Sequence, residues 1–139
     1  MKIKEIQDEI VDEFSMFDDW MERYEYIIDL GKKLPLIAEE NKNDSNLIKG
    51  CQSKVWLQGE QNHDKVVFTA DSDAILTKGI IAILIRTFSN QSAIDILNAD
   101  MDFIDKIGLK EHLSPTRANG LVSMIKNIKM YALAFDAKK

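Results

Sequence analysis

The only cysteine of this 139-residue chain is Cys51, in the segment Gly50-Cys51-Gln52-Ser53. A lone thiol forms neither an internal disulfide nor, by itself, a cysteine-rich metal site. It is therefore either a small buried hydrophobic group or a reactive sulfur. Gly50 frees the backbone before the thiol, and an alternating strand pattern begins after it. This context favours a nucleophile on a mobile loop between a helix and a sheet.

The reactivity of such a thiol depends on its pKa, because the thiolate is the attacking form. Lys49 and Lys54 flank Cys51 within three residues. Their positive charge would lower the pKa of the thiol, although solvent screening of two exposed lysines limits the effect. The local sequence alone leaves a reactive and a structural Cys51 equally open.

Partners for other cysteine chemistry are scarce. A cysteine hydrolase needs a base and a group that orients it, and only His63 and His112 are available. His63 falls in a predicted turn and His112 just before a predicted helix, so a catalytic Cys–His pair is disfavoured. One cysteine and two histidines are too few for a structural zinc site, and none has ligand spacing. No glycine-rich phosphate loop or dinucleotide fingerprint is present.

Arg117 is a second candidate functional residue. It lies in Ser114-Pro115-Thr116-Arg117, where Ser114 is a favourable N-cap and Pro115 fits the first position of a helix. A cation at the start of a helix opposes the helix dipole. We therefore expect Arg117 to pair with a carboxylate. The alternative is that Arg117 is a surface residue without a specific role.

Composition bounds the function further. A chain of 15.9 kDa with 45% hydrophobic and 29% charged residues is expected to form one domain, residues 1–139. Its net charge of -5 argues against nucleic-acid binding. The charge is uneven, because residues 1–47 hold thirteen acids against six bases while residues 101–139 are net basic. The longest apolar stretch, 80–85, is too short to cross a membrane. With no visible signal peptide and a single cysteine, we expect a cytoplasmic protein.

The elements that must position Cys51 follow from hydrophobic periodicity. Alternation predicts strands over 53–61 and 65–70, joined at Asn62-His63-Asp64 as an antiparallel hairpin. Two strands alone are marginal, so a third strand or a helical layer is expected, although no third strand is evident. Asp71-Ser72-Asp73 are expected to cap a buried central helix over 74–88, in which Gly79 indicates close packing. Further helices are predicted near 3–14, 19–31, 92–98, 102–107 and 115–135. The order of elements indicates an α+β fold.

The chain resembles the SufE family of sulfur-acceptor proteins. The matching stretches occur in the family's order and cover most of the chain: residues 26–31 with Leu34-Pro35, 48–56, 71–74 with 78–82, and 112–121. The resemblance implies a curved antiparallel sheet of about three strands covered by helices, as in the IscU scaffold. IscU-type scaffolds use three cysteines, whereas this chain has one.

The resemblance also implies a function. SufE proteins take sulfur from the persulfide of a pyridoxal-phosphate cysteine desulfurase, stimulate that enzyme, and pass the sulfur to a SufBCD-type iron–sulfur scaffold. The matching carrier is Cys51, with Gly50, Gln52 and Ser53 supporting its loop. The segments that match the desulfurase contact contain Asp73 and Arg117. No cofactor or metal is implied for this chain, since the pyridoxal phosphate belongs to the partner.

Two questions remain open at this level. The partner desulfurase would be SufS-like or CsdA-like. The paralogue CsdE pairs with a different desulfurase, and sequence alone distinguishes SufE from CsdE poorly. The alternative function is a desulfurase-binding regulator that acts without sulfur transfer through Cys51. Oligomeric state, the exposure of Cys51 and the roles of His63 and His112 are not predicted.

Overall fold

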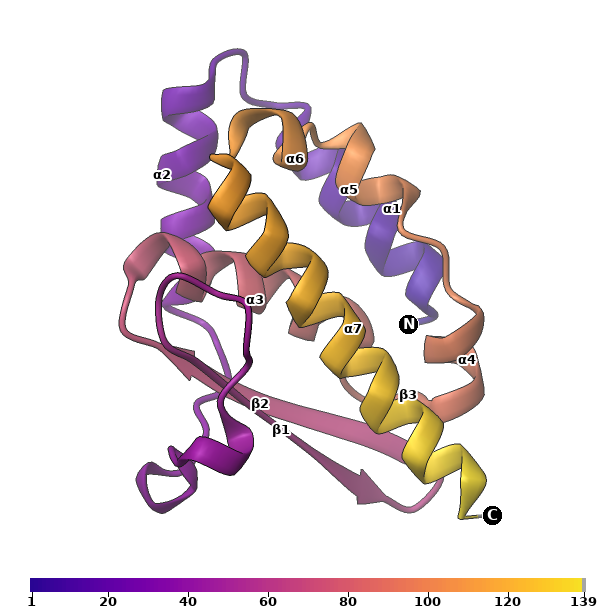
Figure 1. Ribbon diagram of the computed structural model, residues 1–139. Coiled ribbons are helices and arrows are strands. Elements are labelled where there is room, and N and C mark those ends of the chain that lie inside the picture. The colour runs from indigo at the N-terminus through magenta and orange to yellow at the C-terminus, as the bar shows by residue number, and fades with distance from the viewer. Residues whose placement is uncertain (139) are drawn as a thin grey trace.

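The two long strands of the fold form the expected hairpin. In the computed structural model, which describes residues 1–138, β1 (Val55–Asn62) pairs antiparallel with β2 (Lys65–Ser72) (Figure 1). The register runs from Val55 opposite Ser72 to Asn62 opposite Lys65, which leaves a two-residue turn. His63 in this turn has a φ of 60°, a left-handed conformation that tight hairpin turns require. His63 thus has a backbone role in the hairpin.

The third strand is β3 (Gln91–Ser92), which pairs with Lys65 and Val66 at one end of β2. The sheet order is β1-β2-β3, so the expected three-stranded antiparallel sheet and the α+β fold are confirmed. A strand of two residues is too short to show any alternation, which explains why it is not evident from the sequence.

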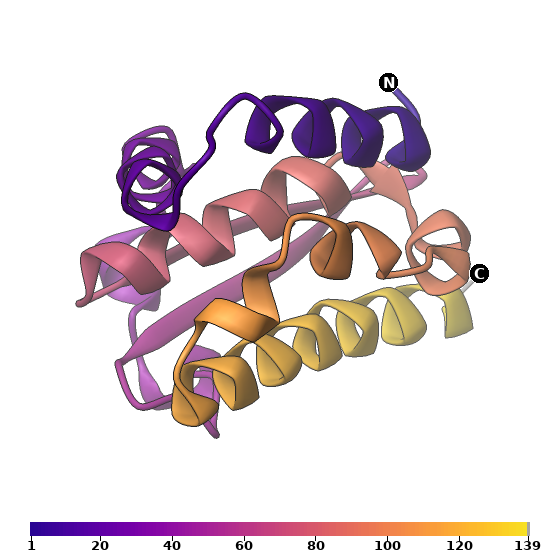
Figure 2. The same cartoon turned by 90° about the horizontal axis from the view of Figure 1, so that it is seen from above.

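The central helix α3 (Ile75–Phe88) packs on the sheet and is buried almost all round. It crosses α2 (Trp20–Gly31) at Gly79, where an added Cβ would overlap the Ile27 carbonyl oxygen. The close packing predicted for Gly79 is therefore confirmed. Helices α1 (Ile3–Phe14) and α7 (Pro115–Ala137) lie on opposite sides of α3 (Figure 2).

Short elements complete the chain: η1 (Glu39–Asn41), η2 (Asp44–Asn46), α4 (Ala93–Asn98), α5 (Asp102–Lys106) and α6 (Leu109–His112). Ser114 caps α7 by accepting from the Arg117 N–H, as predicted. The predicted capping of α3 is wrong. Ala74 is its N-cap and has no side-chain cap, because β2 continues through Ser72 and draws Asp71 and Ser72 into the sheet.

An ion-pair network joins the first three helices. Arg86 on α3 donates from Nη1 and Nη2 to the Glu13 carboxylate of α1, at 2.8 and 2.5 Å. The Tyr26 hydroxyl of α2 donates to the same carboxylate. Arg86 also pairs with Glu9 at 2.5 Å. These bonds hold the pKa of Glu13 below its ordinary value, chiefly through the Arg86 hydrogen bond.

Acid is expected to weaken this network. Because the folded-state pKa of Glu13 is lowered, its stabilisation is complete above the ordinary pKa of 4.5 and is lost as the pH falls through the folded value. We expect Glu13→Gln to lower the urea-unfolding free energy by roughly 1.5–3 kcal/mol at neutral pH. The difference from wild type should shrink as the pH falls below about 4.5. Glu25→Gln, at an exposed position of α2, is the matched control and should change little. A difference that stayed constant with pH would contradict the assignment.

Candidate functional site

Cys51 lies on a short loop whose two ends are fixed. The loop, residues 49–54, leaves and rejoins the sheet where the Ile48 N–H donates to the Val55 carbonyl at 2.8 Å and Leu47 bridges Trp56. Gly50 within it has a φ of 92°, a left-handed conformation that disfavours other residues. A Cβ at Gly50 would also lie 2.6 Å from Ser123 Oγ of α7. The left-handed backbone therefore favours glycine here, and the contact with Ser123 adds a smaller cost to any larger residue.

The Cys51 thiol is half-buried against α7. Its Sγ lies 3.7 Å from the Gly120 carbonyl oxygen, and a Cβ at Gly120 would come within 3.3 Å of the sulfur. A cavity of about 10 Å³ borders the thiol, and Thr77, Ile80 and Met124 line its inner side. This space is at the lower limit for one water molecule. The thiol is thus covered on its inner side without being sealed.

Burial raises the pKa of the Cys51 thiol above its ordinary value of 9.0. The expectation that Lys49 and Lys54 would lower this pKa is wrong, because both lysines are exposed and desolvation is the cause that acts. In the observed conformation the thiolate is disfavoured. Full reactivity would require the loop to move the sulfur towards solvent or a partner.

The other loop residues named from the sequence lie beside the thiol. Gln52 and Ser53 line the same small cavity as Cys51. Neither side chain makes a hydrogen bond to another described residue. The loop end is held instead by Asp73, whose Oδ1 accepts from the Lys54 N–H at 3.0 Å, and by Ser72, whose Oγ donates to the Lys54 carbonyl at 2.8 Å. Asp73 is thus placed at the loop hinge.

Asp71, two residues before Asp73, forms a second set of ion pairs near the loop. Its carboxylate pairs with Lys42 Nζ at 2.5 Å and Lys78 Nζ at 3.3 Å, and the Lys42 ammonium lies 5.6 Å from the centre of the Trp56 ring. The pKa of Asp71 is lowered: burial opposes the change, but the hydrogen bonds from Lys42, Ser72 and Lys78 outweigh it. These ion pairs fix the segment before the loop to β2 and α3.

Arg117 and His112 are near the start of α7. Arg117 is exposed and lines the cavity of Cys51, but it forms no ion pair with a described carboxylate. Its expected carboxylate partner is therefore not found among residues 1–138. His112 stacks on Trp20 at 3.7 Å between ring centres, and the Gly108 carbonyl lies 3.1 Å from its Nδ1. Neither His63 nor His112 lines the cavity of Cys51.

The floor of the site, formed by Gly120, Thr77 and Met124, was not predicted from the sequence. Gly120 lies inside α7, where glycine lowers helix stability by about 1 kcal/mol relative to alanine. A glycine at such a position usually indicates a close contact with a neighbouring segment. The contacts of Thr77 and Met124 had no comparable signal, because both fit an ordinary buried helix face. Within residues 1–138 no group of three or more metal-ligating side chains is present. None of the helices within residues 1–138 combines the length and the hydrophobicity that a membrane span needs.

Releasing the hinge should expose the thiol. Asp73→Ala removes the acceptor for the Lys54 N–H, a charge-assisted bond, so the open loop should become more populated. We expect Cys51 to react with iodoacetamide roughly 5- to 30-fold faster at neutral pH. Asp64→Ala, at an exposed turn position without an ion pair to a described residue, is the control and should react at the wild-type rate. An unchanged rate in Asp73→Ala would show that this bond does not hold the loop.

Comparisons with known proteins identify the family to which the chain belongs. The family model "SufE: Fe-S metabolism associated domain" matches residues 8–132. An uncharacterized SufE-like protein of Rhizobium meliloti (strain 1021) is 43% identical over 130 residues, which cover 90% of this chain and 93% of that protein. A SufE-like protein of Rhizobium etli is also 43% identical, over 127 residues that cover 88% and 86% of the two chains.

A solved structure supports the fold. The solution structure of a hypothetical protein from Thermus thermophilus matches with a TM-score of 0.77 over 93% of this chain and 94% of that one. Its sequence identity is 16%, so this likeness concerns the fold alone. The family model spans Cys51, its hinge and the start of α7. The chain belongs to the SufE family, which is associated with iron–sulfur metabolism.

Proposed function

We propose that this protein accepts sulfur from the persulfide of a pyridoxal-phosphate cysteine desulfurase on Cys51, stimulates the desulfurase, and passes the sulfur to an iron–sulfur scaffold. The observation that carries the proposal is the single thiol on a loop with fixed ends, half-buried against Gly120, in a chain of the SufE family.

The transfer step balances without an oxidant. The Cys51 thiolate attacks the outer sulfur of the desulfurase persulfide, and a new S–S bond forms on Cys51. The S–S bond of the donor breaks, and the desulfurase cysteine leaves as a thiolate. The sulfane sulfur keeps its oxidation state throughout. Transfer to the scaffold repeats the exchange with an acceptor thiol.

The geometry supports a loop that works in two positions. In the observed position the raised pKa of Cys51 keeps the thiol protonated and poorly reactive. The ends of the loop are fixed at Ile48 and Lys54, so the part that would move is residues 49–53, which include the left-handed Gly50. Moving outward would hydrate the sulfur and return its pKa towards the ordinary value. Moving back would shelter the persulfide from other thiols.

The cavity beside Cys51 sets a further condition. Its volume of about 10 Å³ barely admits a water molecule, and a sulfur atom is larger. A persulfide can return to the covered position only if the cavity widens slightly. The flexible side chain of Met124 lines it and can change conformation at low cost.

The SufE family is associated with a cysteine desulfurase. We place the binding surface for this enzyme around the loop of residues 49–54. Arg117 is exposed beside Cys51 and has no carboxylate partner among the described residues, which leaves its guanidinium for a partner protein. The donor would be SufS-like or CsdA-like and the acceptor a SufBCD-type scaffold, in the cytoplasm. The chain would need no cofactor of its own.

Mass spectrometry of the intact protein tests the proposal directly. The purified chain is incubated with a cysteine desulfurase and L-cysteine and then weighed. We expect a gain of about 32 Da per accepted sulfur, reversed by a thiol reductant. The protein incubated with the desulfurase without L-cysteine is the control. No gain with either a SufS-like or a CsdA-like donor would overturn the relay and leave Cys51 as a regulatory or structural thiol.

A further inference from the structure

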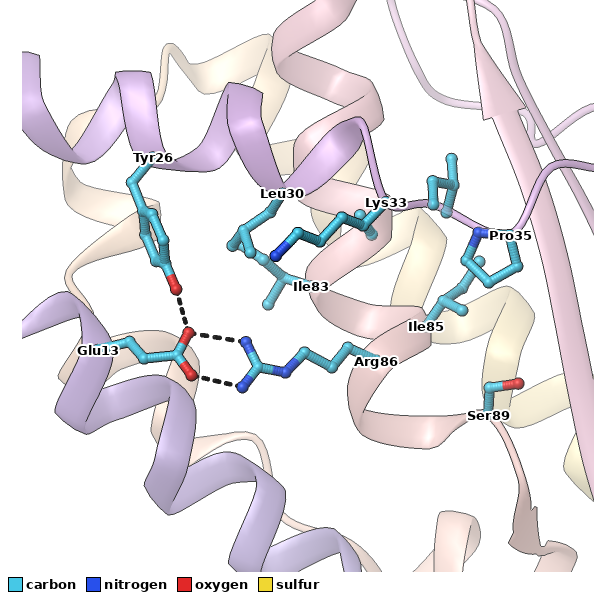
Figure 3. Close-up of a pocket in the computed structure, with 11 residues that line it drawn as sticks. Glu13, Tyr26, Leu30, Lys33, Pro35, Ile83, Ile85, Arg86 and Ser89 are labelled. Carbon is cyan, nitrogen blue, oxygen red and sulfur yellow. Dashed lines mark hydrogen bonds and ion pairs between the residues drawn. The ribbon is translucent and has the colours of Figure 1, made fainter.

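A second cavity lies away from Cys51, between α1, α2 and α3. Figure 3 shows the residues that line it. Its volume is about 470 Å³, within the range of small-molecule sites in proteins. Its wall is mainly apolar and comes from α2, the segment after it, and α3: Leu30, Leu34, Pro35, Ala82, Ile83 and Ile85. Glu13, Tyr26, Lys33, Arg86 and Ser89 contribute its polar groups. The cavity therefore combines an aliphatic wall with a few polar atoms.

The carboxylate that lines this cavity already has hydrogen-bond donors within the protein. The Glu13 carboxylate receives two hydrogen bonds from Arg86 and one from the Tyr26 hydroxyl. Burial, followed by the bond to Glu13, raises the pKa of Tyr26 to about 12, so the phenol stays neutral. The only carboxylate among the described residues of the cavity thus has little capacity left to accept a hydrogen bond from a ligand.

Hydrogen-bond donors, in contrast, remain available. Lys33 forms no ion pair with a residue among 1–138. In Figure 3 its side chain extends along the cavity and ends beside Leu30 and Ile83, pointing towards Tyr26. Its charge acts on Glu13 only through space. Arg86 uses Nη1 and Nη2 on the two glutamates and makes no bond from Nε to another described residue. Ser89 Oγ accepts from the Phe68 N–H, and its own hydroxyl proton has no acceptor within the described chain.

We propose that this cavity binds a small organic carboxylate with an aliphatic body. The cavity has unused hydrogen-bond donors, whereas its carboxylate is already occupied, so it favours a ligand that only accepts hydrogen bonds. The Lys33 ammonium has no carboxylate at contact distance and favours a negatively charged ligand. The apolar wall from Leu30 to Ile85 selects a hydrocarbon chain rather than a polar body. Neutral alcohols fit the wall but lose the charge-assisted bond. Highly charged anions lose the wall contact and meet the carboxylate of Glu13.

The test uses the whole chain alone and octanoate as the probe. Titration is followed in amide ¹H–¹⁵N spectra of the protein, with 1-octanol and acetate as comparison ligands. We expect saturable shifts at Leu30, Lys33 and Ile83, with a dissociation constant on the order of 1 mM for a ligand of this size. Octanol and acetate should each bind roughly tenfold more weakly. Absence of saturable octanoate shifts, or shifts confined to other surfaces, would overturn the proposal.

Two neighbouring lysines provide a matched pair of variants. Lys33→Met should weaken octanoate binding roughly tenfold and leave octanol binding unchanged. Lys32→Met should leave both unchanged, because Lys32 does not line the cavity and pairs with Asp29 at 3.2 Å. Both positions are exposed, so both variants should fold. Equal octanoate affinity in Lys33→Met and wild type would overturn the proposed anion selectivity. Sulfur acceptance on Cys51 does not enter this test.

Discussion

Cys51→Ser is expected to accept no sulfur at all. The intact mass after incubation with a cysteine desulfurase and L-cysteine should stay at the value of the free chain, whereas the wild type gains about 32 Da. The loss should be complete because Cys51 is the only thiol of the sequence and a serine hydroxyl does not attack a persulfide at neutral pH. Fold should be retained, since the site is half-buried and oxygen is slightly smaller than sulfur.

The same variant separates the two proposed functions. A relay requires Cys51, so Cys51→Ser should also lose its stimulation of the desulfurase. A regulator that acts by binding alone would stimulate fully without the thiol. Ser53→Ala is the matched control, because it alters the same loop and leaves the thiol in place. If Cys51→Ser stimulated the desulfurase fully without a gain in mass, the protein would be a regulator and not a sulfur relay.

Gly79→Ala is expected to have the largest effect on stability. In a solvent-exposed helix this substitution would stabilise by about 1 kcal/mol. Here the new Cβ would overlap the Ile27 carbonyl oxygen and lie 2.6 Å from the Ile27 side chain, so α2 and α3 would have to separate. We expect a net loss of about 3 kcal/mol or more in unfolding free energy, measured by urea denaturation. This is a large part of the ~5–15 kcal/mol that typical domains possess.

Gly31→Ala provides a graded comparison on the facing helix. Its Cβ would approach the Gly79 backbone nitrogen at 3.0 Å, a milder contact than that at Gly79. The loss should therefore be smaller than for Gly79→Ala. Stabilisation by alanine at Gly79 would mean that the two helices are not in close contact in solution.

Much of the fold could be predicted because strong local signals agree with the tertiary structure. The hairpin has eight-residue strands and a compact polar turn, and α7 begins with Ser114-Pro115. Elements without such signals were not found. β3 has only two residues, and its Gln91 and Ser92 also look like the approach to α4. The error over Asp71 has a related cause, since an acid before a helix resembles a cap whether or not a strand contains it.

The residue types at the candidate site could be read from the sequence. The features of the site that depend on tertiary packing could not. A single cysteine beside glycine is visible in the sequence, whereas the burial of its sulfur depends on α7, which follows some sixty residues later. The sign of the pKa shift therefore could not be read from Lys49 and Lys54. The Lys42–Asp71 pair likewise joins residues far apart in the chain and has no local spacing rule.

The placement of α1 and α7 on opposite sides of α3 gives the molecule an electric polarity. Figure 2 shows the two helices on either side of α3. Helix α1 carries five acids against one lysine, and α7 carries three bases against one acid. Because both helices pack on the same central element, these charges keep a fixed separation and form a permanent dipole. Such a dipole turns the molecule in the field of a charged partner before the surfaces touch, over about one Debye length of 8–10 Å. Encounters are thus oriented before any contact selects them.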